Sequence, residues 1–346
     1  MKQPRILFVG PMLGKHSGWV PNPAEILAPN FTREGYACIL TSDVLNRYLR
    51  PLNIAQTMLR ERQRYDIVSV QTYSGPSFLV EDMASRIAGY LGKKLVMVLH
   101  GGNMPVFMRQ YPNWSRRVFG RAHAIATPSA YLQDAMSLYG FEAHVIPNML
   151  DIEKYPFRLR ESVQPRLLWM RTFYDYCHPE MAVEVLERLS ARYKNASLTM
   201  CGQDKGLLEP TKQLAEQKGL KSKVRFAGFL NEEAKKREFG AHDIYLNTNR
   251  IDNMPIAVIE AGAFGLPVVA MSVGGIPYLL KDGQTGLLTP FGDVDAMSVA
   301  VCRLVEQPSL SARISRQGRD LAERSAWKNI FPLWDAVYQQ VLERGV

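Results

Sequence analysis

Two carboxylic acids eight residues apart, Asp252 and Glu260, stand on either side of a proline and together could hold a nucleotide. Pro255 suits the first turn of a helix, because its fixed φ fits that turn and its missing N–H is not needed there. Asp252 would then lie in the loop before the helix, and Glu260 about one and a half turns inside it. The unpaired amide groups from Ile256 to Val258 would bind an anion such as a diphosphate. Glu260 could then accept both hydroxyls of a ribose.

The elements that must position these acids follow from a regular pattern. Apolar runs alternate with amphipathic stretches along the chain, which is typical of a parallel α/β fold. The predicted strands are residues 5–10, 39–41, 67–70, 95–99, 124–127, 166–170, 197–201, 224–226, 244–246 and 267–270. Predicted helices between them, with apolar residues at spacings of three and four, include 55–64, 80–91, 179–193 and 255–264.

The pattern predicts two doubly wound, Rossmann-like domains. A break falls at residues 151–156, followed by a polar stretch that contains prolines. We therefore expect an N-terminal domain over residues 1–155 and a C-terminal domain over residues 156–326. Residues 327–346 carry an aromatic stripe at helical spacing and could pack back onto the first domain. Two such domains would face a central cleft at the carboxyl ends of both sheets, where ligands bind.

Composition excludes several classes of protein. Of the 346 residues, 47% are hydrophobic, and there is no low-complexity tract, so a disordered or fibrous chain is excluded. The apolar runs are too short to span a membrane. Residues 1–5 run directly into a predicted strand, so we expect no export signal. Four scattered cysteines then predict reduced thiols in a cytoplasmic protein, at most peripheral to the inner face of the membrane.

Positive charge is concentrated in the first half. Residues 1–155 carry a net charge of +6 and residues 156–346 carry +3, which favours an anionic partner. Basic residues are interleaved with aromatic or apolar ones in two segments, 47–64 and 109–121. These would suit an anionic membrane or a lipid-phosphate acceptor, and a merely solvated face is the alternative. Nucleic acid is a poorer fit, because no nucleic-acid-binding motif accompanies the charge.

The segment 249–269 resembles the second-domain motif of retaining GT-B glycosyltransferases, specifically glycosyltransferase family four (glycosyl transferases group 1). That motif has a glutamate, seven further residues, Glu-Ala and then Gly-x-Pro-Val-Val. Here Asp252 stands at the first acid, one methylene shorter, while Glu260-Ala261 and Gly265–Val269 match. The resemblance implies that Glu260 binds the nucleotide ribose and that the loop at Asp252 contacts the donor sugar. The residues that would complete this nucleotide site are Asn253, Met254, Pro255 and Ile256.

Further segments resemble the family in the same order along the chain. The glycine loop 10–18, with Gly14, resembles the loop that approaches the donor phosphates. Leu99-His100-Gly101-Gly102 resembles the strand end whose histidine meets the donor sugar, which implies that role for His100. Segments 198–204 and 226–230 resemble the two loops that hold the base, and the residues implied there are Gly202, Gly228 and Phe229.

Residues 167–171 resemble the strand that delivers an arginine, here Arg171, to the donor diphosphate. Family members carry a lysine shortly afterwards, and residues 172–179 contain none. The second cation could be Lys15, Lys205 or His178, or local hydroxyl and amide groups could serve instead.

Asp293-Val294-Asp295 has the form of the metal signature of the other glycosyltransferase fold. Its place before a helical stretch favours an N-cap and a first-turn acid instead. We therefore predict no catalytic metal, and no cofactor beyond the nucleotide-sugar substrate. Segments 273–277 and 282–288 also match the family, and we expect loops and turns there.

The resemblance implies a retaining, metal-independent glycosyltransferase for hexose or N-acetylhexosamine, with its catalytic residues at His100, Arg171 and Asp252. A UDP-sugar donor is favoured. The C-terminal domain would hold this donor, and the N-terminal domain a glycan, glycolipid or other hydroxyl acceptor. Two alternatives remain open: a nucleotide-sugar-binding protein with a degraded site, and a GT-B epimerase or phosphorylase. A phosphorylase would need a pyridoxal-phosphate lysine, for which no motif is present.

Overall fold

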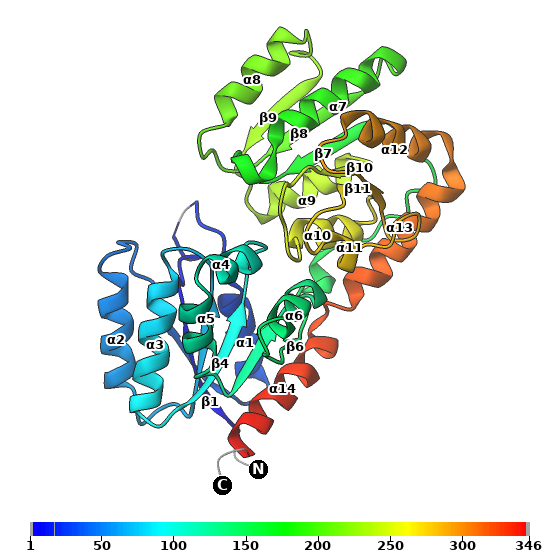
Figure 1. Ribbon diagram of the computed structural model, residues 1–346. Coiled ribbons are helices and arrows are strands. Elements are labelled where there is room, and N and C mark those ends of the chain that lie inside the picture. Colours follow the sequence, from blue (N-terminus) through cyan, green and yellow to red (C-terminus); the bar gives the residue numbers. More distant parts are fainter. Residues whose placement is uncertain (1–2, 17, 344–346) are drawn as a thin grey trace. The chain divides into compact units, whose positions relative to one another are not determined.

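The computed structural model describes residues 3–16 and 18–343. The chain divides into two compact units: unit 1 comprises Met1–Met149 and Trp327–Val346, and unit 2 comprises Leu150–Ala326. Each unit contains a six-stranded parallel sheet with helices against it (Figure 1). The predicted α/β class is therefore confirmed. None of the helices in the described residues is both long and apolar enough to cross a membrane.

Unit 1 begins with a buried strand and ends with a helix from the far end of the chain. Its strands are β1 (Arg5–Val9), β2 (Ala37–Thr41), β3 (Ile67–Thr72), β4 (Lys94–Leu99), β5 (Ala124–Thr127) and β6 (His144–Val145). Its helices are α1 (Pro23–Arg33), α2 (Arg50–Arg60), α3 (Phe78–Tyr90), α4 (Met104–Gln110), α5 (Pro112–Phe119), α6 (Ala130–Ser137) and α14 (Trp327–Glu343).

Unit 2 has the same plan. Its strands are β7 (Arg166–Met170), β8 (Ser197–Cys201), β9 (Val224–Gly228), β10 (Ile244–Asn247), β11 (Val268–Met271) and β12 (Leu287–Thr289). Its α-helices are α7 (Pro179–Arg192), α8 (Leu208–Gln217), α9 (Glu232–Ala241), α10 (Ile256–Phe264), α11 (Ile276–Leu279), α12 (Val294–Glu306) and α13 (Pro308–Glu323). Two short 3-10 turns, η1 (Ile152–Lys154) and η2 (Asp175–Cys177), complete the unit.

Strand order reverses once in each sheet. The order is β2-β1-β3-β4-β5-β6 in unit 1 and β12-β11-β10-β7-β8-β9 in unit 2. The chain continues on one side of β1 to β2 and on the other side to β3, and likewise from β7 to β8 and to β10. The topological switch points therefore lie at the carboxyl ends of β1/β3 and of β7/β10. Such switch points are where open α/β sheets bind ligands.

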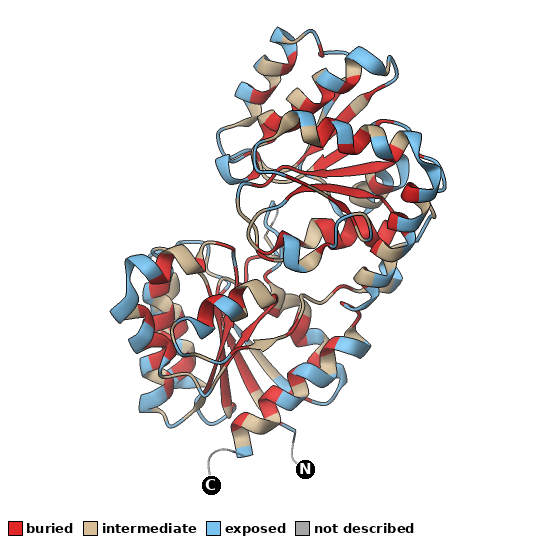
Figure 2. Cartoon of the chain, turned by 45° about the vertical axis from the view of Figure 1, so that its right-hand side comes forward, coloured by how far each residue is buried: buried red, intermediate tan, exposed pale blue. Residues whose placement is uncertain are grey.

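Side chains alternate across each buried strand, so both faces of a sheet need cover (Figure 2). In unit 1, β1 directs Leu7 and Val9 into one core cluster and Ile6 and Phe8 into another. The second cluster is completed by α1 and by the aromatic stripe of α14, which contributes Ile330, Trp334, Val337, Tyr338 and Val341. Helix α14 is therefore part of unit 1.

One loop expectation was only partly right. Residues 282–288 were expected to be loop and turn, and 283–285 do form a turn, but Leu287 and Leu288 belong to β12, which pairs with β11 through Val269 and Leu287. This edge strand has only three residues, too few for period-two alternation to appear in the sequence.

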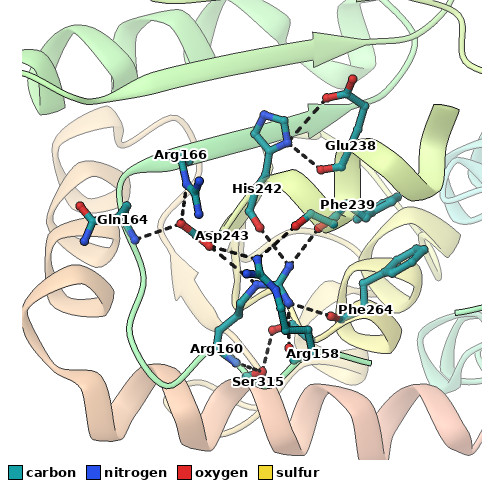
Figure 3. A network of polar contacts seen from close by, with 12 residues as sticks. Arg158, Arg160, Gln164, Arg166, Glu238, Phe239, His242, Asp243, Phe264 and Ser315 are labelled. Carbon is teal, nitrogen blue, oxygen red and sulfur yellow. Dashed lines mark hydrogen bonds and ion pairs between the residues drawn. The ribbon is translucent and has the colours of Figure 1, made fainter. Parts of the chain in front are cut away.

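A buried charge network fixes the start of unit 2 (Figure 3). The carboxylate of Asp243, 4% exposed, accepts from Arg166 Nε at 2.8 Å and forms an ion pair with Arg158 at 3.5 Å. Arg160, 2% exposed, donates to the carbonyls of Arg158, Phe239, His242 and Phe264. Burial lowers the pKa of Arg160 to about 10. The segment 158–166 is thereby fastened to the sheet before β7 begins.

We predict that Asp243→Ala lowers the free energy of unfolding by roughly 3–5 kcal/mol, because it leaves the buried Arg160 without its counter-charge. Urea unfolding followed by fluorescence measures the change. The control is Asp295→Ala, which removes the exposed ion pair with Arg188 and should lower the free energy of unfolding far less. If both variants lowered the free energy of unfolding equally, the buried network would contribute no more to stability than the exposed ion pair does.

Candidate active site

The structure brings two of the predicted site residues into contact at the switch point of unit 2. Arg171 follows β7 and Asp252 follows the neighbouring β10, and Arg171 Nη2 lies 3.0 Å from Asp252 Oδ2. Their side chains are 24% and 12% exposed. Burial acts to lower the pKa of Arg171, but the nearby Asp252 carboxylate raises it, and the net shift is upward. The guanidinium therefore stays charged and faces the edge of the sheet where a ligand would bind.

The loop of Asp252 is held by its own polar groups. Asn249 Nδ2 donates to Asp252 Oδ2, and the Asn253 backbone N–H donates to Oδ1 at 2.8 Å. The carboxylate thus has partners on both oxygens.

Glycines behind this loop allow a very close backbone approach. A Cβ on Gly274 would lie 2.2 Å from the Asp252 carbonyl oxygen, and one on Gly275 only 1.9 Å from that of Asn253. The Gly275 N–H donates to the Asp252 carbonyl at 3.0 Å. The prediction of a loop at 273–277 is confirmed, although α11 begins within it at Ile276. These glycines set the position of the acid.

A close backbone contact with Gly202, which follows β8, likewise fixes the position of Arg171. A Cβ on Gly202 would lie 1.8 Å from the Arg171 carbonyl oxygen, and Gly202 has a φ of +149°, which suits glycine alone. The Gly202 N–H donates to the Gly228 carbonyl at 2.9 Å, so the ends of β8 and β9 are joined here. Phe229, the next residue, is 47% exposed. Gly202, Gly228 and Phe229 therefore lie at the same edge of the sheet as Arg171.

The helix predicted after Asp252 begins at Ile256, with Pro255 as its N-cap in extended conformation. The Val258 N–H donates to the Pro255 carbonyl at 3.1 Å. That amide was expected to be free for an anion and is not, so Ile256 and Ala257 are the remaining candidates in this turn. Asn253 and Met254 lie in the loop directly before the cap.

Glu260 is 6% exposed on α10 and has two donors on one oxygen. Tyr155 Oη donates to Oε1 at 2.9 Å, and Lys235 Nζ, from α9, donates to the same atom at 2.5 Å. Burial, reinforced by the charge of Glu260, raises the pKa of Tyr155, so its hydroxyl keeps the proton that it donates. Because both donors bond Oε1, Oε2 is the atom that this arrangement offers to a ligand.

Tyr245 on β10 links these groups. Its ring is fully buried, and its pKa is raised first by burial and also by the charges of Glu260 and Asp252, against the influence of Arg171. Of the three predicted residues of unit 2, Arg171 and Asp252 are in direct contact, and Glu260 lies on α10, the helix that follows the loop of Asp252.

Lys235 and Tyr155 were missed by the sequence analysis. The sequence offered Lys15, Lys205 or His178 as the second cation near Arg171. Lys15 lies in unit 1, where it forms an ion pair with Asp43, and Lys205 is exposed. Lys235 has no motif around it, and only the tertiary packing of α9 beside α10 reveals its contact.

In unit 1, His100 directly follows β4 and is 8% exposed. Its Nε2 lies 2.8 Å from Gln71 Oε1, and its ring stacks on Tyr73 with centroids 5.1 Å apart. Burial lowers the pKa of His100 to about 4, so the ring is neutral at pH 7. It can exchange hydrogen bonds with a ligand but does not supply a positive charge.

The glycine loop of unit 1 already binds a carboxylate. The Gly14 N–H donates to both oxygens of Glu25, at 3.0 and 3.2 Å, and Glu25 also accepts from the Asn22 N–H at the start of α1. A Cβ on Gly14 would lie 2.6 Å from Pro21 Cα, so glycine is required. Ser17 of this loop lies outside the described residues.

The predicted helix cap at Asp293 is confirmed. Its Oδ1 accepts from the Ala296 N–H at 2.8 Å, and Asp295 forms an ion pair with Arg188. Within residues 3–16 and 18–343, no group of three or more histidine, cysteine or acidic side chains is arranged to hold a metal ion.

Part of the basic segment 109–121 is packed into unit 1, although Tyr111, Arg109, Arg116 and Arg117 are exposed. Phe119 is 1% exposed, and Trp114 Nε1 donates to Asp82 at 2.9 Å. Arg121 also bonds Asp82, at 2.6 Å. The segment 47–64 differs, because Tyr48, Leu49 and Leu52 are 72%, 54% and 68% exposed beside its arginines.

Comparison with known proteins places both units in one family. A family model described as Glycosyl transferases group 1 matches residues 151–321, and one described as Glycosyltransferase Family 4 matches residues 17–154. The phosphatidyl-myo-inositol mannosyltransferase of Mycobacterium leprae is 26% identical over 249 residues, which cover 70% of this chain. The match spans 64% of that relative, less than two thirds of its length. The GDP-mannose-dependent alpha-(1-6)-phosphatidylinositol monomannoside mannosyltransferase of Mycolicibacterium smegmatis is 24% identical over 340 residues, covering 91% of this chain and 88% of the relative.

Solved structures agree on the fold. HepE from Anabaena, crystallised with UDP and glucose, superposes with a TM-score of 0.78 at 16% identity, covering 99% of this chain and 100% of that one. Sucrose-phosphate synthase from Thermosynechococcus elongatus gives a TM-score of 0.78 at 13% identity, with coverage of 99% and 100%. The two matched models together with this fold show that the chain belongs to glycosyltransferase family 4 and has the GT-B fold of two Rossmann-like units.

Proposed function

We propose that the protein is a glycosyltransferase that moves a sugar from a nucleotide-sugar donor to a hydroxyl acceptor with retention at the anomeric carbon. The observation that carries the proposal is the cluster of Arg171, Asp252 and Glu260 at the switch point of unit 2. A cation, the N-terminus of a helix and a buried carboxylate match the diphosphate and ribose of a nucleotide in chemical type.

Glu260 binds the ribose in this proposal. Lys235 and Tyr155 hold Oε1, so Oε2 accepts the ribose hydroxyls. Arg171 binds the diphosphate and is available because its partner Asp252 also has bonds from Asn249 and Asn253. Negative charge grows on the diphosphate as the sugar leaves, and Arg171 with the amides of Ile256 and Ala257 stabilises it. The base is held by the loops of Gly202, Gly228 and Phe229.

Asp252 and His100 act on the sugar. His100, neutral and fixed by Gln71 and Tyr73, orients a sugar hydroxyl rather than transferring a proton at neutral pH. No side chain is assigned as a covalent nucleophile. The acceptor attacks on the face that the diphosphate leaves, and the departing phosphate takes the acceptor proton. Arg171 and the helix amides supply the positive charge at the diphosphate, and we propose that no metal is required.

The donor is proposed to be a UDP-sugar of a hexose or N-acetylhexosamine. HepE was solved with UDP-glucose, whereas the mycolicibacterial relative is described as GDP-mannose-dependent, so the two precedents differ in the base. The named relatives act on inositol lipids or inositol phosphate, which supports a polyol, glycan or glycolipid hydroxyl as acceptor.

The proposal is tested with UDP-, GDP-, ADP- and dTDP-sugars. A donor at about 100 times its dissociation constant should stabilise the protein by about 2.7 kcal/mol, measured by thermal shift. The product formed from an α-linked donor should be α-linked by proton NMR, with and without EDTA. Binding without transfer to any acceptor would favour a degraded binding protein, and an epimerised donor would favour an epimerase. An inverted product would contradict retention, and activity lost in EDTA but restored by Mg²⁺ or Mn²⁺ would contradict metal independence.

We predict that Glu260→Gln weakens binding of the nucleoside diphosphate by roughly 1–3 kcal/mol, because the ribose hydroxyls lose a charged acceptor. The same variant should bind the 2′,3′-dideoxy nucleotide almost as the wild type does. Isothermal titration calorimetry measures both.

Lys235→Met should also weaken binding of the nucleoside diphosphate, because Glu260 then keeps only the hydrogen bond from Tyr155. The matched control on α9 is Lys236→Met, which removes only the pair with Glu233 and should leave affinity unchanged. Equal effects of the two lysine variants would argue against a role for Lys235 at the ribose.

We further propose peripheral contact with an anionic membrane through the segment 47–64. Exposed Tyr48, Leu49 and Leu52 stand beside arginines there, and this combination is typical of an interfacial surface. Glu61, which pairs with Arg60 and Arg64, offsets only part of the charge.

The protein should therefore sediment with anionic liposomes at low salt, and much less with neutral ones. Each arginine near the surface contributes about 1 kcal/mol within a Debye length of about 8 Å at physiological salt, so binding should fall as salt rises. Changing Leu49 and Leu52 to Ser should reduce sedimentation, whereas changing Arg116 and Arg117 to Gln should have little effect. If the arginine changes reduced sedimentation more than the leucine changes, the segment 109–121 would be the membrane-binding surface instead.

A further inference from the structure

A basic pocket lies in unit 1 at the amino ends of two strands. It has a volume of about 510 Å³, which is typical of a small-molecule site. Lys93 and His123, which directly precede β4 and β5, line it together with Leu95. The remaining lining residues come from α3 and from a turn before β5: Ser85, Arg86, Gly89, Tyr90 and Arg121. The pocket is therefore at the edge of the sheet opposite its carboxyl ends, where His100 and the switch point of unit 1 lie.

The positive charge of this pocket is only partly balanced. The carboxylate of Asp82 accepts from Arg86 Nε at 3.0 Å and from Arg121 Nη1 at 2.6 Å, so the two guanidiniums lie side by side. Lys93 Nζ donates to an uncharged group, the Tyr65 carbonyl, at 2.8 Å. Among the described residues that line the pocket, three are cationic and none is acidic. The pocket therefore carries an excess of positive charge, which attracts an anion.

Two features near the pocket could offset this excess, but each already has its own partners. Asp66, which precedes β3, is bonded by Arg5 through both carboxylate oxygens, at 2.8 and 2.6 Å. The C-terminal end of α3 would repel an anion if its last carbonyls were unpaired. The carbonyls of Ile87, Ala88 and Gly89 instead each accept a backbone N–H from the residues that follow the helix. The side chains that line the pocket therefore dominate its charge.

His123 adds an uncharged hydrogen-bond donor. The Leu95 N–H donates to His123 Nδ1 at 3.1 Å, so Nδ1 carries a lone pair. Burial and the charge of Lys94 lower the pKa of His123, so the ring is neutral at pH 7. The single ring proton is then on Nε2. Lys93 and Arg121 keep further N–H groups for a ligand, because an ammonium has three and a guanidinium has five.

We propose that this pocket binds the phosphate group of a phosphomonoester through Arg86, Lys93 and Arg121. The Nε2–H of His123 is a further donor. A phosphomonoester carries a charge of about −1.5 to −2 at pH 7 and three strong acceptor oxygens, which suits several cationic donors better than a carboxylate does. Leu95 and the exposed ring of Tyr90 offer apolar surface to the carbon body of the ligand. The site does not depend on the proposed function, because the candidate donor site belongs to unit 2.

The test measures binding of sn-glycerol 3-phosphate to the full chain by isothermal titration calorimetry, with glycerol as the blank. Gly89 is exposed, and a Cβ there would meet no atom within 4 Å. Gly89→Glu therefore places a negative charge at the pocket without a clash, and should weaken binding by about tenfold or more. Arg86→Gln removes one cation and should weaken binding by about threefold or more.

Two control variants separate charge from bulk and from general effects. Gly89→Gln adds a side chain of the same size without the charge, and should weaken binding far less than Gly89→Glu does. Gly240→Glu makes the same exchange at an exposed glycine of α9, where a Cβ also meets no atom within 4 Å. It should leave binding unchanged. Phosphate bound at Arg171 in unit 2 would not respond to Gly89→Glu and is distinguished in this way.

Phosphatidic acid presents the same phosphomonoester on a membrane. Sedimentation with phosphatidylcholine vesicles that contain phosphatidic acid is compared with sedimentation with vesicles that contain phosphatidylserine at equal total charge. A preference for phosphatidic acid that Gly89→Glu loses and Gly240→Glu keeps identifies a lipid head group as the ligand. The same pattern with sn-glycerol 3-phosphate alone identifies a soluble one.

Either pattern supports the phosphate site. The proposal is overturned if the wild type binds sn-glycerol 3-phosphate no better than glycerol and does not prefer phosphatidic acid. It is also overturned if Gly89→Glu binds as the wild type does, if Gly240→Glu loses as much as Gly89→Glu, or if Gly89→Gln does.

Discussion

The pairing of β7 with β10 is short, and a charged contact closes it at each end. Only Ile244 with Leu167 and Tyr245 with Leu168 are in register between the two strands. At their beginnings Arg166 bonds Asp243, and at their ends Arg171 bonds Asp252. The first contact belongs to a deeply buried network and holds the strands together. The second stands at the ligand edge, where an incoming diphosphate can compete for the arginine. The candidate donor site depends on this frame, because Arg171 and Asp252 follow these two strands and Glu260 lies on α10, which comes next in the chain.

Backbone contacts at glycine, more than side-chain packing, set the geometry of the site. Gly202 lies against the Arg171 carbonyl, and Gly274 and Gly275 lie against the loop of Asp252. A glycine also allows close backbone packing between α10 and α13, where a Cβ on Gly262 would lie 2.6 Å from the Gly318 carbonyl oxygen. Helix α10, which carries Glu260, therefore packs directly against α13. Such contacts tolerate little movement, so the ends of β7, β8 and β10 form a rigid edge rather than a set of mobile loops.

Most strands and the cap at Asp293 could be predicted from the sequence, because each depends on local pattern. Arg171, Asp252 and Glu260 were selected by resemblance to a family, and the ion pair between Arg171 and Asp252 was not predicted. Other features depend on packing between distant segments. Lys235 and Glu260 lie on separate helices, so no spacing of residues along the sequence predicts their contact. In the sequence, Phe119 and Trp114 stand beside arginines as a surface stripe would. In the structure, Phe119 is buried in the core and Trp114 donates to Asp82. The three residues of β12 are likewise defined only by their partner strand.

The position of α14 has a consequence for synthesis on the ribosome. Ile6 and Phe8 are made long before Ile330, Trp334 and Tyr338, which complete their side of the sheet. Unit 2 is continuous in sequence and is fully translated before α14. At roughly 5–20 residues per second, the face awaiting α14 stays uncovered for on the order of ten seconds or more. During that interval the nascent chain presents an apolar sheet surface to chaperones and to other nascent chains, so unit 1 is complete only after α14 has left the ribosome.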